Sequence, residues 1–339
     1  MDTIKTAVVG VGKIAQIAHL PTLKKMEGVE LVAVCDVDEK KMAHIIRKFE
    51  IPRWYSLVDE LLEREEIDAL HICTANYYHY PMALMALRKG IHVFVEKPLA
   101  LNVQDAQKIA QVAREQNRTV MVGMQHRFRD DVQILREFLR NNDLGELFFF
   151  KSGWLKKWSK ELQLSWELKK QYSGGGVLMD FGIHLIDMML YLTGMPEIRT
   201  ARLLPYRLRE NLEVEDSALA LLQTESGLGV TIEMSWNLHL DHDIQYTHIF
   251  GKQGSAYLNP LRIQKEMHGS LVTVTPIQNE KAGDRYLRAY ETEIRHFYDV
   301  IRQKEKNMSP PEDAVNVLRV IKALYDSARQ NRDILLAQS

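Results

Sequence analysis

The feature that most constrains this chain is a glycine turn close to its first residues. The apolar run Ala7–Val9 leads directly into Gly10-Val-Gly12-Lys-Ile-Ala15, and a helical pattern follows. Gly10 permits a tight turn, Gly12 leaves room for a pyrophosphate against the main chain, and Ala15 lets the helix pack closely on the strand. Since a helix N-terminus favours anions, the turn predicts a dinucleotide site, with an ordinary strand-to-helix turn as the alternative.

Length, charge and cysteine content narrow the class of protein. A chain of 339 residues is long for one core, which predicts two domains. The net charge of −1 gives no electrostatic attraction to nucleic acid or to an anionic membrane. Cys35 and Cys73 lie in apolar runs and are typical of buried thiols in a reducing compartment. With no signal-peptide pattern and no apolar run near the ~18 residues of a membrane span, we expect a cytoplasmic protein.

The first third of the chain alternates short apolar strands with helices. This order predicts a doubly wound parallel sheet, an α/β fold of the Rossmann type, in a domain of residues 1–124. The expected strands are Ile4–Gly10, Val29–Cys35, Ala69–Cys73, His92–Val95 and Thr119–Gly123, and the expected helices are Lys13–Lys25, Glu39–Phe49, Leu57–Glu65, Tyr80–Lys89 and one from Asn102 to about Gln116.

After Met124 the pattern changes to successive alternating strands, which predicts a second domain, residues 125–339, with a large open, mainly antiparallel sheet. Such a sheet has few helices to cover it, so we expect a homodimer or homotetramer formed through it. The expected strands are Leu147–Lys156, Ile198–Leu208, Ser217–Thr224, Gly229–Trp236, Tyr246–Phe250, Ala256–Leu258 and Leu271–Pro276, and the expected helices are Asp130–Arg140, Gly176–Leu192, Tyr290–Lys304 and Glu312–Asn331.

Polar residues follow the strands of the first domain. Asp36 follows the second strand, where a carboxylate can bind both ribose hydroxyls of an adenosine and repel a 2′-phosphate, so we expect NAD, with NADP less favoured. Its alternative role is a helix cap. The segment Thr74–His79 suits either a second phosphate or a turn with an N-cap. Lys97, before Pro98, is either a hydrogen-bond donor to a substrate oxygen or a surface lysine beside a turn.

A second group of candidate residues follows three glycines in the second domain. Asp180, His184 and Asp187 have i, i+4, i+7 spacing on a predicted helix, so they share one face. A histidine near a carboxylate suits a general acid or base, and a core histidine is the alternative. No second histidine or cysteine stands nearby at ligand spacing, so we expect no metal site. The aromatic residues that precede the glycines suit either a sugar or the core; they are Trp154, Trp158, Trp166 and Tyr172.

Taken together, these motifs resemble the glucose-fructose oxidoreductase / inositol dehydrogenase family. The resemblance rests on GVGKIA, Asp36, Thr74-Ala-Asn76-x-x-His79, Glu96-Lys97-Pro98 and GGGVLMDFGIHLID, and it runs through the closing Tyr325-Asp-Ser327-Ala328. It implies a Rossmann domain, a C-terminal α/β domain whose open sheet makes the oligomer interface, and a cis Lys97–Pro98 bond. Ala75 stands where the family often has proline. Gln125-His126-Arg127 replaces the usual Asn-Arg-Arg, so no role is assigned to His126, while Arg127 is retained.

Site roles follow from the motifs and the resemblance together. The expected catalytic residues are Lys97, Asp180 and His184; the expected cofactor-binding residues are Gly10, Gly12, Lys13, Ile14, Ala15, Asp36, Thr74, Asn76, His79, Glu96, Lys97 and Gln125; the expected substrate-binding residues are Arg127, Trp166, Tyr172, Asp180 and His184. We expect an NAD-dependent oxidoreductase that acts on a secondary hydroxyl of a sugar, cyclitol or sugar derivative. The alternatives are a redox-neutral enzyme that keeps NAD bound, of the glycosidase or epimerase type, and a non-catalytic dinucleotide or sugar sensor.

Overall fold

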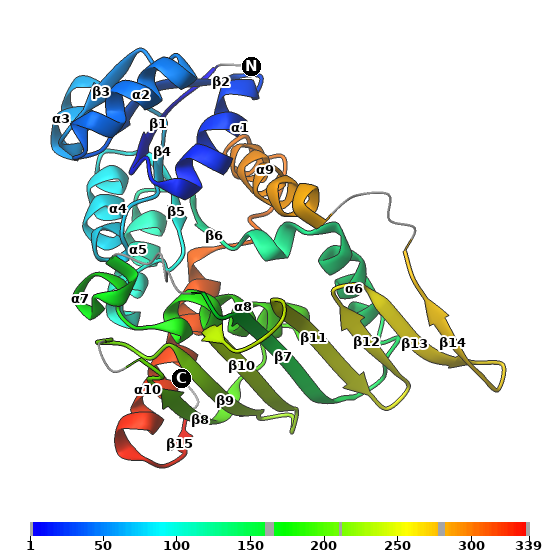
Figure 1. Ribbon diagram of the computed structural model, residues 1–339. Helices are drawn as coiled ribbons and strands as arrows, with labels where there is room; N and C mark the ends of the chain where they lie inside the picture. Colours follow the sequence, from blue (N-terminus) through cyan, green and yellow to red (C-terminus); the bar gives the residue numbers. More distant parts are fainter. Residues whose placement is uncertain (1–2, 160–165, 210–211, 277–281, 337–339) are drawn as a thin grey trace. The chain divides into compact units, whose positions relative to one another are not determined.

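The computed structural model describes residues 3–159, 166–209, 212–276 and 282–336. The chain forms two compact units, Met1–Phe128 with Lys281–Val315, and Arg129–Glu280 with Asn316–Ser339. The helix that begins at Ala282 packs with the first of these units, and the domain boundary after residue 124 stays a prediction. Each unit is built around one sheet (Figure 1).

The first unit is a six-stranded parallel sheet of order β3-β2-β1-β4-β5-β6. Its elements are β1 (Ile4–Val9), η1 (Ala15–His19, π-helical), α1 (Leu20–Lys25), β2 (Val29–Cys35), α2 (Glu39–Phe49), β3 (Arg53–Tyr55), α3 (Val58–Arg64), β4 (Ala69–Ile72), η2 (Asn76–Tyr78), α4 (His79–Arg88), β5 (His92–Glu96), α5 (Val103–Glu115), β6 (Val120–Gly123), η3 (Gln125–Phe128) and α9 (Ala282–Ile301). The sequence pattern predicts every strand of this sheet except β3, whose three residues are too short to show a period.

The second unit contains a nine-stranded sheet of order β14-β13-β12-β11-β7-β10-β9-β8-β15, in which only β7 and β10 pair in parallel. Its elements are α6 (Asp130–Arg140), β7 (Leu147–Lys157), η4 (Trp166–Leu168), α7 (Lys170–Ser173), η5 (Leu178–Gly182, π-helical), α8 (Ile183–Leu192), β8 (Ile198–Tyr206), β9 (Ser217–Thr224), β10 (Gly229–Leu238), β11 (Ile244–Gly251), β12 (Gly254–Leu258), β13 (Arg262–Met267), β14 (Ser270–Val274) and β15 (Ile334–Leu335); α10 (Pro311–Gln330) begins in the first unit and continues into the second. The mainly antiparallel sheet is confirmed, and β13 and β15 are additions to it.

The apolar patterns explain how each sheet is covered. In the first unit, side chains of β1, β5 and α9 meet in one core that includes Val8, Phe94 and Phe297. In the second unit, every residue of α8 is buried, and α8 contacts β7. The helical stretch Lys170–Leu192 is long and apolar enough to cross a membrane by length and composition, but 94% of its most apolar window is buried inside the protein. It is therefore built as a core helix.

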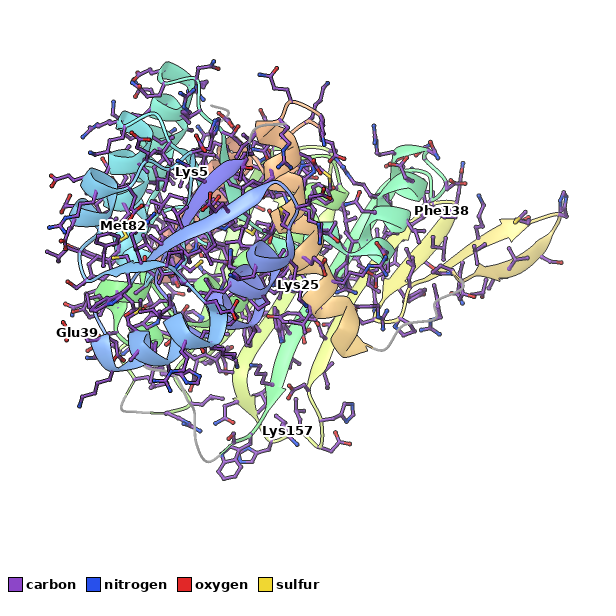
Figure 2. All side chains as sticks on the ribbon, turned by 90° about the horizontal axis from the view of Figure 1, so that it is seen from above. Lys5, Lys25, Glu39, Met82, Phe138 and Lys157 are labelled. Atoms are coloured by element: carbon purple, nitrogen blue, oxygen red, sulfur yellow. The ribbon has the colours of Figure 1, made fainter. Side chains whose placement is uncertain are left out.

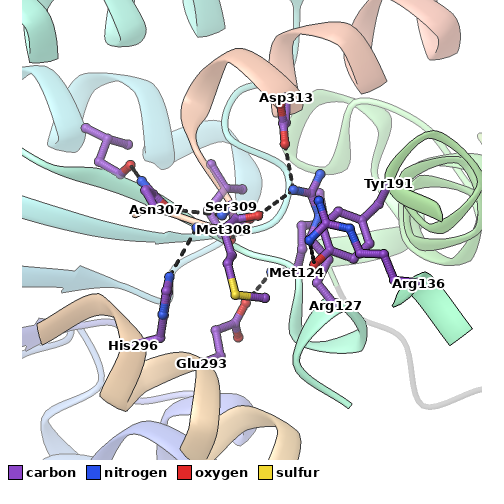
Figure 3. Close-up of polar contacts among 12 residues, drawn as sticks. Met124, Arg127, Arg136, Tyr191, Glu293, His296, Asn307, Met308, Ser309 and Asp313 are labelled. Carbon is purple, nitrogen blue, oxygen red and sulfur yellow. Dashed lines mark hydrogen bonds and ion pairs between the residues drawn. The ribbon is translucent and has the colours of Figure 1, made fainter. Parts of the chain in front are cut away.

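The edge of the first sheet at β6 is closed by a segment from the far end of the chain (Figure 3). The Ser309 carbonyl accepts a hydrogen bond from the Val122 amide at 3.0 Å, and the Ser309 hydroxyl donates to the Val122 carbonyl at 2.6 Å. The guanidinium of Arg127, 1% exposed, donates to the Met308 carbonyl at 2.7 Å and to the Asp313 carboxylate at 2.6 Å. These contacts fix η3, where the chain leaves β6.

Replacing Arg127 by methionine is expected to lower the free energy of unfolding by roughly 3 kcal/mol, because it leaves a partly buried carboxylate and a buried carbonyl without their donor. Urea denaturation measures the change. The control is Arg114→Met, which removes an exposed ion pair with Glu312. Glu312 lies beside Asp313 at the start of α10, and the loss of this pair is expected to cost less than about 1 kcal/mol. Equal stability of the two variants would contradict this account of Arg127.

Candidate functional site

The glycine turn lies at the carboxyl edge of the parallel sheet, where β1, β2 and β4 end side by side. Gly10 has φ +84, and a Cβ on it would come within 2.6 Å of the Cys73 carbonyl oxygen, so only glycine fits. A Cβ on Gly12 would meet nothing within 4 Å. The main chain at Gly12 is therefore open to a ligand while Gly10 is closed against the protein.

Asp36 is held in place beside this turn. One carboxylate oxygen accepts from the Val11 amide at 2.8 Å, and the other accepts from the Asp38 amide at 3.0 Å. The Lys41 ammonium is 3.7 Å from the first oxygen. The helix-capping alternative belongs to Asp38, which accepts from the Lys41 amide at the start of α2, so Asp36 is not the cap.

The remaining predicted cofactor residues lie along the same edge of the sheet. Lys13 is exposed at the start of the first helical segment, Ile14 and Thr74 are half-buried, and Asn76 is buried in η2. The ring nitrogens of His79 lie 2.7 Å from the Pro98 carbonyl and 3.0 Å from the Thr74 carbonyl. The roles of these residues toward a cofactor stay predictions.

Gln125 offers the clearest sign that a ligand belongs here. Its side chain is 2% exposed, and within the described parts of the chain no hydrogen-bond partner is found for its Oε1. A buried carbonyl oxygen without a donor is costly, so a donor from a ligand would stabilise it. Together with the open Gly12 main chain and the ordered Asp36 carboxylate, it fits a dinucleotide whose pyrophosphate lies against the turn.

Lys97 follows β5 and is half-buried, and the Lys97–Pro98 bond is cis, as the resemblance implies. The preceding Glu96 is 7% exposed, and its carboxylate pairs with the His19 side chain at 2.8 Å. A Cβ on Gly123, at the end of the neighbouring strand, would stand 3.0 Å from that carboxylate. The turn that carries Lys97 is thus held by the His19 side chain, and Gly123 leaves room for the Glu96 carboxylate.

The second unit carries Asp180 and His184. Asp180 lies in the π-helical segment η5, and its carboxylate accepts from the indole Nε1 of Trp236 at 2.9 Å. His184 is 5% exposed in α8, with its ring centroid 6.0 Å from that of Trp154. Asp180 thus lies in the π-helical part and His184 in the α-helical part of one continuous helical segment. Asp187, 1% exposed, is a core residue of the same helix.

Two of the three glycines before Asp180, Gly175 and Gly176, serve close packing, while Gly174 ends α7 with a φ of +82. The Glu215 carboxylate accepts from the amides of Gly176 at 3.1 Å and Leu178 at 3.2 Å, and from the Tyr325 hydroxyl at 2.8 Å. A Cβ on Gly175 would overlap the Tyr325 hydroxyl, and one on Gly176 would overlap the Glu215 main chain. Burial raises the pKa of Glu215. A carboxylate at the start of this helical segment also complements its free N–H groups.

Three aromatic candidates are placed differently. Trp154 stacks on Phe181, the residue that follows Asp180, with 4.3 Å between the ring centroids. Trp166 and Tyr172 are half-buried in and after η4, and their substrate roles stay predictions. Residues 160–165 of the same loop lie outside the described residues. Figure 2 shows Lys157, where this loop begins, at the end of its strand, and the Lys157 amide donates to Asp243 of the neighbouring loop at 2.9 Å.

Sequence reasoning missed the partners of the candidate residues. Trp236 reaches Asp180 from 56 positions away in the chain, Glu215 reaches Gly176 from 39 positions away, and Tyr325 lies against Gly175 from far later in the chain. No local pattern marks them. Among the described residues, no group of three or more histidine, cysteine, aspartate or glutamate side chains could hold a metal ion.

Comparison with known proteins agrees with this geometry. A family model described as "Oxidoreductase family, NAD-binding Rossmann fold" matches residues 4–124, and one described as "GFO/IDH/MocA C-terminal domain" matches residues 132–257. The D-glucoside 3-dehydrogenase of Escherichia coli is 27% identical over 96% of this chain and 95% of its own. The scyllo-inositol 2-dehydrogenase (NAD(+)) of Bacillus subtilis is 25% identical over 98% and 96%.

A solved structure shows the same fold. Levoglucosan dehydrogenase, in complex with NADH and levoglucosan, covers 99% of this chain and 100% of its own with a TM-score of 0.89 and 20% identity. Residues 4–124 are therefore an NAD-binding Rossmann domain of an oxidoreductase family.

Replacing Gly12 by alanine is expected to weaken NAD binding about tenfold or more, since the new methyl group occupies the face left open to the pyrophosphate, without lowering the melting temperature. Calorimetric titration with NAD and thermal denaturation measure the two effects. In contrast, Gly10→Ala meets the Cys73 carbonyl and should lower stability. Unchanged NAD affinity in Gly12→Ala would refute the placement of the pyrophosphate.

Glu215 gives a pH-dependent prediction. Its pKa is higher in the folded protein than in the unfolded chain, so the folded state binds more protons and stability falls as pH rises through the folded pKa. Glu215→Gln keeps an acceptor oxygen but does not ionise. The free energy of unfolding of the variant, relative to wild type, should therefore rise between about pH 4 and pH 7. Urea denaturation at both pH values would show a constant difference if this were wrong.

Proposed function

The chain belongs to the Gfo/Idh/MocA oxidoreductase family, and on that premise we propose that it is an NAD-dependent dehydrogenase of a secondary hydroxyl on a sugar, a cyclitol or a sugar derivative. The family's N- and C-terminal models together match most of the chain, and relatives named for glucoside and inositol oxidation align over nearly its full length. Bound NAD supplies the hydride acceptor for such an oxidation.

The observation that carries the proposal is the chemistry of three polar side chains. Lys97 is a cation at the ligand edge of the NAD-binding sheet. Asp180 and His184 are a carboxylate and an imidazole on one helical segment of the second unit. We assign all three to the same substrate hydroxyl, as the motifs imply.

Each residue then has a defined task. His184 takes the hydroxyl proton as the carbon–oxygen bond becomes a carbonyl. Lys97 donates a hydrogen bond to the same oxygen and stabilises its developing negative charge. Asp180, held by the Trp236 indole, orients the substrate or His184. Gly12, Asp36 and Gln125 hold the cofactor, and Arg127 stays a proposed substrate residue whose guanidinium also carries the contacts to Met308 and Asp313.

Removal of the proposed acid/base group is expected to lower kcat by roughly 10²–10⁴-fold, with NAD affinity retained. The variants are His184→Ala and Lys97→Ala, measured by NADH absorbance with a confirmed substrate. Matched controls are His44→Ala, exposed on α2, and Lys108→Ala, half-buried on α5. Turnover equal to wild type in either site variant would contradict the role assigned to that residue.

A substrate panel tests the function itself. NAD-loaded protein is incubated with sugars, glycosides and cyclitols, and NADH formation, product formation and binding are followed together. NADH with product supports the dehydrogenase. Product without net NADH indicates the redox-neutral enzyme, and binding without product indicates a sensor; either result contradicts the proposal.

We also propose that the chain forms a homodimer or homotetramer through the nine-stranded sheet. Strands β9 and β10 alternate buried and less buried residues, which leaves one face of the sheet for a partner. Sedimentation equilibrium distinguishes these states, and a monomer at micromolar concentration would contradict the proposal.

A further inference from the structure

A chain of hydrogen-bonded side chains crosses the buried core of the first unit and ends next to Lys97. His19 Nε2 lies 2.8 Å from the Glu96 Oε1, and His19 Nδ1 lies 2.9 Å from His71 Nδ1. His71 Nε2 is 2.9 Å from the Tyr298 hydroxyl, which is 2.9 Å from the Thr6 hydroxyl. Glu96 is 7% exposed and the other four side chains are fully buried. The proposed mechanism above uses none of the four.

The burial of His71 determines the direction of the hydrogen bonds. Desolvation lowers the pKa of His71 well below its ordinary value, so its ring is neutral and carries one N–H. If His71 donates through Nδ1 to His19, its Nε2 accepts from Tyr298, and His19 donates through Nε2 to the Glu96 carboxylate. Burial also raises the pKa of Tyr298, which keeps its hydroxyl a donor. Every group then has its partner.

The opposite direction fails at one contact. If His19 donated through Nδ1 to His71, a neutral His19 would present a bare Nε2 to the Glu96 oxygen at 2.8 Å. Two acceptors at that distance repel, which only a further proton would relieve. The first arrangement therefore satisfies the network with the fewest buried charges.

The position of His19 follows from the first helical segment. His19 is the last residue of the π-helical segment η1, which begins at Ala15 directly after the glycine turn. A π turn shifts the register of the side chains by one residue relative to an α-helix, and such turns recur at functional sites. The N-terminus of η1 faces the predicted pyrophosphate, and the last residue of η1 places its imidazole next to Glu96.

The other side of Lys97 is held by a second histidine. His79 Nδ1 lies 2.7 Å from the Pro98 carbonyl oxygen, and the His79 side chain is fully buried. Glu96 is held through its carboxylate and Pro98 through its carbonyl, so the residue between them has a fixed main chain. Gly123 leaves the space that the Glu96 carboxylate needs, because a Cβ there would stand 3.0 Å from it.

We propose that His19 is a positioning residue for Lys97: by donating a hydrogen bond to Glu96, with His71 and Tyr298 behind it, His19 holds the Glu96–Pro98 turn so that the Lys97 ammonium meets the substrate oxygen in a fixed orientation. This inference rests on the proposed function for the role of Lys97. The hydrogen-bond directions and the rigidity of the turn do not depend on it, and the test measures them separately.

The first test compares His19→Leu with His19→Gln, whose carboxamide can still donate to Glu96. His19→Leu is expected to lower kcat about 10- to 100-fold, because misplaced catalytic groups lose rate steeply, while the NAD dissociation constant changes by less than about threefold. Amide hydrogen exchange of the peptide that contains Lys97 and Leu99 should become faster. His19→Gln should recover most of both effects. The control is His92→Leu, which removes an imidazole from the start of β5, the strand that ends at Glu96. It should change neither kcat nor the exchange rate.

A second test needs no folded variant of His19. Nitrogen-15 spectra of the imidazoles in the wild-type protein should show His19 as the Nε2–H tautomer and His71 as the Nδ1–H tautomer. Gly123→Ala, whose Cβ would stand 3.0 Å from the Glu96 carboxylate while His19 is intact, should lower kcat by less than His19→Leu does and also speed exchange at Lys97.

The outcomes separate the two proposals. Wild-type protein without turnover on any substrate would refute the proposed function, and the exchange and tautomer measurements would still decide the role of His19. Reversed tautomers, unchanged exchange and kcat in His19→Leu, or equal impairment in His19→Gln and His19→Leu would each overturn the positioning role. Loss of NAD affinity in parallel with kcat would also overturn it, because it would show a general loss of structure.

Discussion

The contact between Gly10 and the Cys73 carbonyl is the constraint on which the rest of the first unit depends. It brings the end of β1 against the end of β4 at a distance that excludes any side chain. The main chain then turns so that Gly12 is open and Ala15 begins the π-helical segment. The cofactor edge and the approach of His19 to Glu96 both start from this turn, because the same short segment leads from one to the other.

The second unit also contains glycines that are packed too closely to carry a side chain. Gly175 and Gly176, before Asp180, are required by the closeness of Tyr325 and Glu215. The Glu215 carboxylate fixes the start of the segment that carries Asp180, and Trp236 fixes the carboxylate of Asp180 itself. In both units, polar groups from distant parts of the chain hold a proposed catalytic residue or its neighbour. Trp236 holds Asp180 in a π-helical turn, and His19 holds Glu96, which precedes Lys97.

Local patterns predicted most of the fold. The strands Val29–Cys35 and Ser217–Thr224 and the helix Glu39–Phe49 have the predicted bounds, because their hydrophobic periods are long and end in clear caps or turns. Short strands such as β3 and β15 have too few residues for a period. The place of α9 in the first unit depends on packing across 150 or more positions, which no local pattern contains.

The site divides in the same way. Glycines, a strand-end carboxylate and the Glu-Lys-Pro turn have positional meaning that sequence alone reveals, and the family matches agree with the cofactor they indicate. The residues that hold them, His19, Glu215, Trp236 and Tyr325, act through hydrogen bonds to groups far along the chain, so their types carry no signal by themselves.

The most direct test of the central claim is to follow hydrogen from substrate to cofactor. Protein loaded with NAD is incubated with glucose, a glucoside and an inositol that carry deuterium on carbon, and the nicotinamide is analysed by mass spectrometry. A dehydrogenase of a secondary hydroxyl transfers one deuterium to the nicotinamide ring, and this is the result we predict for at least one of these substrates. A product formed with no deuterium on the nicotinamide would contradict the account.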